Sequence, residues 1–147
     1  MSRPSIKDWE AYQSYFDKEL SSIIIPEEIE THVVKHLTYR LNKLYDEVFF
    51  EFTRHKSLYE NIDDLVDEVK YRNMKGSNAE DRKKNAYDSV ANYVNPKGVS
   101  YNLFEYRRQY REKYNFLKAV IDSINSKKSS LITDSGVLKI EASLLSG

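Results

Sequence analysis

The sequence contains no cysteine, only four glycines and three prolines, and no long hydrophobic run. Without cysteine the chain has neither a disulfide framework nor thiolate chemistry. Four glycines leave little material for a phosphate-cradling glycine loop. The longest apolar runs have three residues, as at Ile23–Ile25, which is too short to cross a membrane. Met1 is followed by Ser2 and Arg3 rather than by a signal-peptide core. We therefore expect a cytoplasmic protein that does not insert into membranes.

Charged side chains, by contrast, make up 31% of the chain, which is above the ordinary quarter, and they balance to zero. Residues 1–69 carry 8 basic and 15 acidic side chains, whereas residues 70–147 carry 15 basic and 8 acidic ones. Such a split suggests a molecule with two charged faces or two partners. The alternative is that neighbouring helices of opposite charge neutralise each other inside the fold.

Helical periodicity fills the stretches between the few glycines and prolines. A short helix over about 6–20 is predicted by four residues at helical spacing: Trp9, Tyr12, Phe16 and Leu20. Pro26 suits the first turn of a second helix, which we expect over 27–72 because apolar residues recur at steps of three and four from Ile29 to Phe52 and no glycine or proline follows until Gly76. A break near Asn61–Asp64 is the alternative. A helix of that length needs a packing neighbour along all of it, from its own chain or from another copy.

Turn-forming residues delimit the rest of the chain. A loop at 73–78 precedes a helix predicted over 79–94, capped by Ser77 or Asn78, and the turn Asn95–Gly98 precedes a helix over 101–128, capped by Ser100. The tail, 129–147, is open between a hairpin and a broken helix that docks onto another subunit. We therefore predict a single all-α domain, a long-helix bundle of about four helices with an apolar C-terminal tail, completed by oligomerisation. The apolar tail residues expected to mediate oligomerisation are Leu131, Ile132, Val137, Leu138, Ile140, Leu144 and Leu145.

Residue types used in catalysis are present, but their arrangement is not typical of an active site. Glu28, His32 and His36 have a spacing that could hold a metal, yet no further ligand of clear identity accompanies them, so we favour surface histidines. A run of carboxylates, Asp63, Asp64, Asp67 and Glu68, fits a solvated acidic face better than a hydrolytic pair, and it could serve as a docking surface for a protein partner. We expect no enzymatic activity, no cofactor and no metal.

The second half of the chain combines positive charge with aromatic rings, the two features that single-stranded nucleic acid requires. Tyrosines at the core rim and snorkelling arginines are the alternative interpretation. No motif for base-specific reading accompanies these residues, so binding should be sequence-tolerant and salt-sensitive. The candidate nucleic-acid-binding residues are Lys70, Tyr71, Arg72, Lys75, Arg82, Lys83, Arg107, Arg108, Arg111 and Lys118.

Three stretches also carry a family resemblance. The predicted long helix ends in Val69-Lys70-Tyr71-Arg72 before a loop with Gly76, the next helix opens with Asp81-Arg82-Lys83-Lys84, and Phe116–Lys128 ends in an Ile-x-Ser-basic pattern before an apolar tail. In order and spacing, over about residues 30–145, these stretches resemble the UvsY-type recombination mediators of T-even and related phages. Those are small, helical, oligomeric proteins with a Lys-x-Arg pair that grips DNA, which corresponds to Lys70 and Arg72 here.

The resemblance implies a single-stranded-DNA-binding mediator that helps load a RecA-like recombinase onto DNA covered by a single-strand-binding protein. It would act as a homo-oligomer in the cytoplasm of an infected bacterial host, with its acidic half free to meet the protein partners. Three other classes stay open: a helical self-assembling adaptor that binds a protein and no nucleic acid, an inhibitor that mimics nucleic acid with its acidic half, and a small enzyme.

Overall fold

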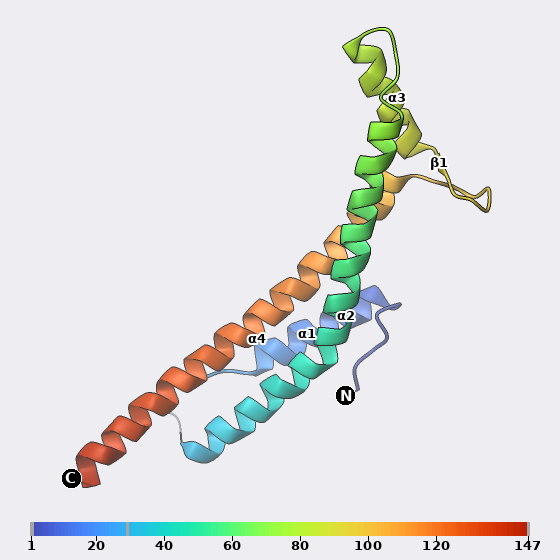
Figure 1. Ribbon diagram of the computed structural model, residues 1–147. Helices are drawn as coiled ribbons and strands as arrows, with labels where there is room; N and C mark the ends of the chain where they lie inside the picture. Colours follow the sequence, from blue (N-terminus) through green and yellow to red (C-terminus); the bar gives the residue numbers. More distant parts are fainter. Residues whose placement is uncertain (1, 29, 147) are drawn as a thin grey trace. The chain divides into compact units, whose positions relative to one another are not determined.

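The computed structural model describes residues 2–28 and 30–146, with side chains as far as Thr133. Within these residues the chain forms four helices, α1 (Trp9–Ser22), α2 (Thr31–Arg72), α3 (Ala79–Ala91) and α4 (Leu103–Ser146) (Figure 1). One small antiparallel hairpin, β1 (Tyr93–Val94) and β2 (Ser100–Tyr101), joins α3 to α4. The predicted all-α class with about four helices is confirmed. None of the described helices combines the length and the apolarity that a bilayer crossing requires.

The chain divides into two compact units, where the sequence showed no boundary. The first unit comprises residues 1–52 and 116–147, and the second unit comprises residues 53–115. Helices α2 and α4 each contribute residues to both units.

The first unit is built around the apolar face of α1. Tyr12 and Phe16 are fully buried, and their core includes Leu41 of α2 and Leu117 of α4. Trp9 extends this core, since its ring lies 5.3 Å from that of Phe116 in an edge-on arrangement. Helix α1 begins later than predicted because Asp8 is its N-cap, and the Asp8 carboxylate accepts a hydrogen bond from the Ala11 backbone N–H at 3.4 Å.

The second unit has a smaller core to which three helices contribute. Val66 and Val69 of α2 pack with Val90 of α3 and Leu103 of α4. Asn78 caps α3, as predicted for one of two candidates, because its side-chain oxygen accepts from the Asp81 backbone N–H at 2.8 Å.

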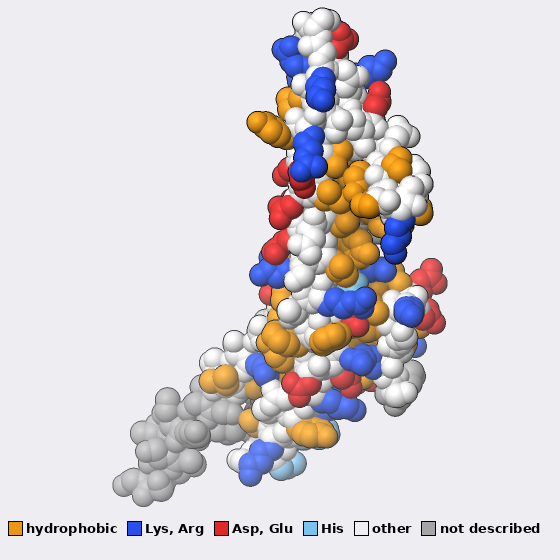
Figure 2. Space-filling view, turned by 45° about the vertical axis from the view of Figure 1, so that its right-hand side comes forward, with side chains coloured by type: hydrophobic (Ala, Val, Ile, Leu, Met, Phe, Trp, Pro, Cys, Tyr) orange, Lys and Arg blue, Asp and Glu red, His pale blue; other side chains and the backbone are white. Residues whose placement is uncertain are grey.

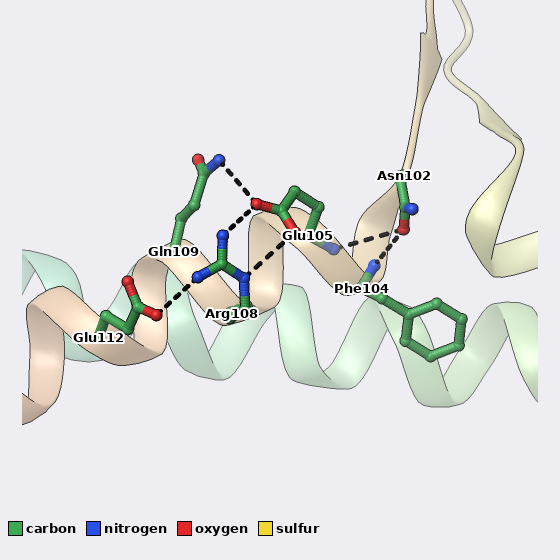
Figure 3. Close-up of polar contacts among 6 residues, drawn as sticks. All are labelled: Asn102, Phe104, Glu105, Arg108, Gln109 and Glu112. Atoms are coloured by element: carbon green, nitrogen blue, oxygen red, sulfur yellow. Dashed lines mark hydrogen bonds and ion pairs between the residues drawn. The ribbon is translucent and has the colours of Figure 1, made fainter.

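Three predicted boundaries are wrong, for local reasons. Helix α2 begins at Thr31 rather than at residue 27, because the Glu30 carbonyl accepts the first helical hydrogen bonds and Pro26 belongs to the preceding link. Helix α3 ends at Ala91 because Tyr93 and Val94, aromatic and β-branched, pair with β2 instead. The cap of α4 is Asn102, not Ser100: its side-chain oxygen accepts from the backbone N–H groups of the next turn (Figure 3).

The C-terminal tail continues α4 as one helix to Ser146, so the helix is neither replaced by a hairpin nor broken, the two alternatives left open for the tail, and the predicted helix end at residue 128 is wrong. Most residues after 128 are adequate helix formers, and a single helical glycine, here Gly136, costs only about 1 kcal/mol relative to alanine. The interruption expected around Asp134-Ser135-Gly136 does not break the hydrogen-bonded helix.

Candidate nucleic-acid interface

Five of the predicted nucleic-acid-binding residues surround the connection between α2 and α3 in the second unit. We call this exposed group the α2–α3 tip: Tyr71, Arg72, Lys75, Arg82 and Lys83. Residues 70–84 carry six basic and two acidic side chains. Figure 2 shows Lys and Arg side chains around the top of the second unit, beside hydrophobic side chains. Tyr71 is 82% exposed, so both faces of its ring can meet a ligand.

The loop at the tip is held by its own polar groups. The Asn73 amide donates to the Val69 carbonyl at 2.8 Å, the Asn85 amide donates to the Lys75 carbonyl, and the Arg82 guanidinium donates to the Gly76 carbonyl at 3.4 Å. Gly76 itself has a φ of +156°, and a Cβ added there would lie 2.7 Å from the Asp81 Cβ. The loop therefore requires glycine at this position, and it presents the Lys75 side chain to solvent.

A second group of side chains is organised around one phenylalanine. The Lys70 Nζ lies 5.4 Å from the centroid of the Phe104 ring, and the Arg107 guanidinium carbon lies at the same distance. Tyr87 stacks on Phe104 with a centroid separation of 4.9 Å and an interplanar angle of 28°, while 59% of Tyr87 stays exposed. We call these four residues the Phe104 cluster. Each of α2, α3 and α4 contributes to it, so it fixes two cations beside an accessible ring.

Arg107 is the least exposed of the candidate arginines. Its Nη1 lies 3.4 Å from the Asp63 carboxylate, and only 22% of its side chain is exposed. The Arg107 Nε is buried and makes no hydrogen bond with a described residue. The guanidinium is thus anchored between Asp63 and Phe104.

Arg108 is enclosed by carboxylates of its own helix. It forms ion pairs with Glu105 and, at 2.7 Å, with Glu112 (Figure 3). These contacts raise the pKa of Arg108, mainly through the hydrogen bond to Glu105, and lower the pKa of Glu105 through the same bond. Its charge is therefore compensated locally. Arg72 is also paired, with Glu68 at 2.5 Å, although 72% of its side chain is exposed.

The remaining candidate cations divide between the two units. Arg111 is exposed in the second unit, and Lys118 is exposed in the first unit and so is not part of either group.

The predicted acidic surface is only partly free. Asp63 pairs with Arg107 and Glu68 pairs with Arg72, whereas Asp64 and Asp67 are exposed. At Asp63, therefore, the two oppositely charged halves of the sequence neutralise each other across neighbouring helices.

The predicted oligomerisation residues differ in how exposed their side chains are. Leu131 is 2% exposed and belongs to the core of the first unit, so it is not available to a second subunit, and that assignment is wrong. A helix continued past residue 128 turns this side chain inward. Ile132 is 73% exposed. The side chains of the other five predicted residues lie outside those described: Val137, Leu138, Ile140, Leu144 and Leu145.

The histidine spacing singled out in the sequence lies in an exposed region. His32 Nδ1 is 3.3 Å from the Glu30 carboxylate, and both side chains are more than three-quarters exposed. Among the residues that the structure describes, no group of three or more His, Asp or Glu side chains is arranged to hold a metal ion.

Two members of the Phe104 cluster are missing from the residues predicted as binding sites. Tyr87 and Phe104 are 17 positions apart on different helices, and neither belongs to a basic run. Two features of the sequence could have indicated them: Phe104 lies at helical spacing from Arg107 and Arg108, and Tyr87 is an aromatic residue in the otherwise highly polar α3.

Comparison with known proteins finds no matching family model, no matching curated protein and no matching solved structure.

Proposed function

We propose that this chain binds single-stranded DNA through the α2–α3 tip and the Phe104 cluster. The observation that carries the proposal is the Phe104 cluster, where two cations and an accessible stacked tyrosine come together from three helices. Cations at such a site neutralise phosphates and release condensed counterions. The exposed rings of Tyr71 and Tyr87 would stack on bases, which only an unpaired strand presents freely.

The biological role that fits this activity is the one implied by the resemblance. We propose a recombination mediator without enzymatic activity, which works in the cytoplasm and helps load a RecA-like recombinase onto DNA covered by a single-strand-binding protein. As a homo-oligomer, several tips would hold one strand, and avidity would strengthen individually weak contacts. Exposed Asp64 and Asp67 would be available to one of the protein partners.

The direct test is the binding of a fluorescent oligo(dT) strand, followed by anisotropy over a range of salt concentrations. The variant Lys75→Gln/Lys83→Gln removes two exposed cations from the tip. The slope of log K against log salt is negative, and each lost phosphate contact on a single strand should make it shallower by about 0.7. The slope of the double variant should therefore be shallower by about 1.4 than that of the unaltered protein.

A matched control is Lys18→Gln/Lys35→Gln, which removes the same charge from exposed positions of the first unit. Its slope should equal that of the unaltered protein. Equal slopes for all three proteins would contradict the proposed location, and an absence of binding at roughly micromolar protein and low salt would contradict nucleic-acid binding itself.

The adaptor is the second candidate, and two observations favour it. Arg72, Arg107 and Arg108 are each paired with carboxylates, which reduces the charge available to a polyanion. In addition, Tyr39 and Phe50 of the first unit are 69% and 70% exposed on one side of α2. An adaptor would show no salt-dependent binding to oligo(dT) and would instead self-associate in light scattering.

A further inference from the structure

A groove lined by four tyrosines lies in the second unit, next to the hairpin. Its volume is about 390 Å³, within the usual range of small-ligand sites. Tyr93 and Tyr101 come from the two strands, where they are paired in register, and Tyr106 and Tyr110 come from α4. The apolar side chains along the groove are Ile62, Leu65 and Leu103.

The tyrosine rings of the groove are arranged one after another. Tyr101 and Tyr106 meet edge to face at 5.2 Å, and Tyr106 and Tyr110 are 6.4 Å apart with an interplanar angle of 34°. Asn95 adds a polar group, and its side-chain oxygen is already used by the backbone N–H groups of Lys97 and Val99. Its amide nitrogen makes no hydrogen bond with a described residue. Flat aromatic walls with one free donor suit a planar heterocycle that carries acceptor oxygens.

The groove and the Phe104 cluster use adjacent faces of the first two turns of α4. Leu103, Tyr106 and Tyr110 line the groove, while the intervening Phe104 and Arg107 belong to the cluster. The positive charge of Arg107 complements the negative charge of a phosphate. A phosphate held at Arg107 would therefore place its own base within reach of the tyrosine rings of the groove.

We propose that this groove receives bases of the bound strand, stacked against Tyr106 and held at an acceptor oxygen by the Asn95 amide. The inference rests on the proposed function and adds its specificity: the protein distinguishes a strand with bases from a bare sugar-phosphate chain. The α2–α3 tip and the Phe104 cluster then supply phosphate contacts, and the groove adds a stacked base to those expected on the exposed rings of Tyr71 and Tyr87.

The test compares oligo(dT) with an abasic deoxyribose-phosphate strand of equal length, at fixed salt, by anisotropy. For Tyr106→Leu, affinity for oligo(dT) should fall by about fivefold or more, the lower bound for one stacked base, with no change for the abasic strand. Tyr106→Phe keeps the ring and should bind both strands as the unaltered protein does. Tyr39→Leu, an exposed tyrosine of the first unit, should do the same.

The results distinguish a failure of base binding in the groove from a failure of strand binding as a whole. If Tyr106→Leu weakens the binding of both strands equally or of neither, the groove does not receive bases, while strand binding at the tip stands. If the unaltered protein binds both strands equally, neither the groove nor the exposed rings of Tyr71 and Tyr87 stack on bases, and only the phosphate contacts stand. If the unaltered protein binds neither strand, strand binding and the groove are both refuted. Should Tyr106→Leu fail to fold, Tyr101→Leu replaces it with the same expected result.

Discussion

Replacing Tyr12 with phenylalanine should stabilise the first unit, and the gain should increase at high pH. Tyr12 is fully buried against Phe16 and Trp9, and its hydroxyl makes no hydrogen bond with a described residue. An unsatisfied buried hydroxyl costs about 1–3 kcal/mol, so Tyr12→Phe should raise the free energy of unfolding by roughly 1 kcal/mol at pH 7.

The pH dependence follows from the ionisation of the same hydroxyl. Burial raises the pKa of Tyr12 from 10.0 to about 12, with smaller contributions from Glu51 and Glu47, which raise it, and from Arg3, which lowers it. Because the folded-state pKa is raised above the unfolded value of 10.0, ionisation of Tyr12 does not affect the free energy of unfolding below pH 10. As pH rises from 10 to about 12, the free energy of unfolding of the unaltered protein falls. One pKa unit corresponds to about 1.4 kcal/mol, so the loss should be about 1.4 kcal/mol at pH 11 and roughly 2–3 kcal/mol above pH 12.

Urea unfolding of both proteins at pH 8, 10 and 11 measures this difference. Tyr15, whose pKa is also raised by burial and by its hydrogen bond to Glu47, titrates in both proteins and so cancels in the comparison. The gap between Tyr12→Phe and the unaltered protein should widen by about 1.4 kcal/mol between pH 8 and pH 11. A gap that stays constant, or a phenylalanine variant that is less stable at pH 8, would refute the assigned environment of Tyr12.

Three further changes test the loop, the cap and the tail. Gly76→Ala should lower the melting temperature and weaken strand binding, because its Cβ would collide with the Asp81 Cβ; unchanged melting would contradict the loop geometry. Asn78→Ala should cost about 1 kcal/mol in urea unfolding by removing the cap of α3, and a cost near zero would contradict that cap. Leu131→Ala should cost about 2–5 kcal/mol, whereas Ile132→Ala should stay within roughly 0.5 kcal/mol; equal costs would contradict their opposite burial.

The helices could be predicted because their apolar spacing is a local property of the chain. Leu37, Leu41, Leu44 and Val48 follow one another at steps of three and four, and all four are buried in the first unit. The hairpin at Tyr93–Tyr101 left no comparable signal, since strands of two residues are too short to show a period.

The candidate interface was only partly accessible from the sequence. The basic runs at Lys70–Lys75 and Arg82–Lys84 identify the α2–α3 tip because neighbouring residues stay together at a helix end and in a loop. The ion pair between Arg107 and Asp63 joins positions 44 residues apart, so its neutralising effect required the packing of α2 against α4. Tyr87 and Phe104 were missed for the same reason, since their stacking depends on α3 and α4 meeting.

The nested order of the two units has a consequence for how the chain folds. The second unit is one continuous segment, whereas the first unit is assembled from residues 1–52 and 116–147. During synthesis the second unit is complete once residue 115 has emerged, but the first must wait for the C-terminal segment that supplies Leu117, Ile124 and Leu131 to its core. Early folding of the second unit shortens the loop that the first must close, which lowers the entropic cost of bringing its two segments together.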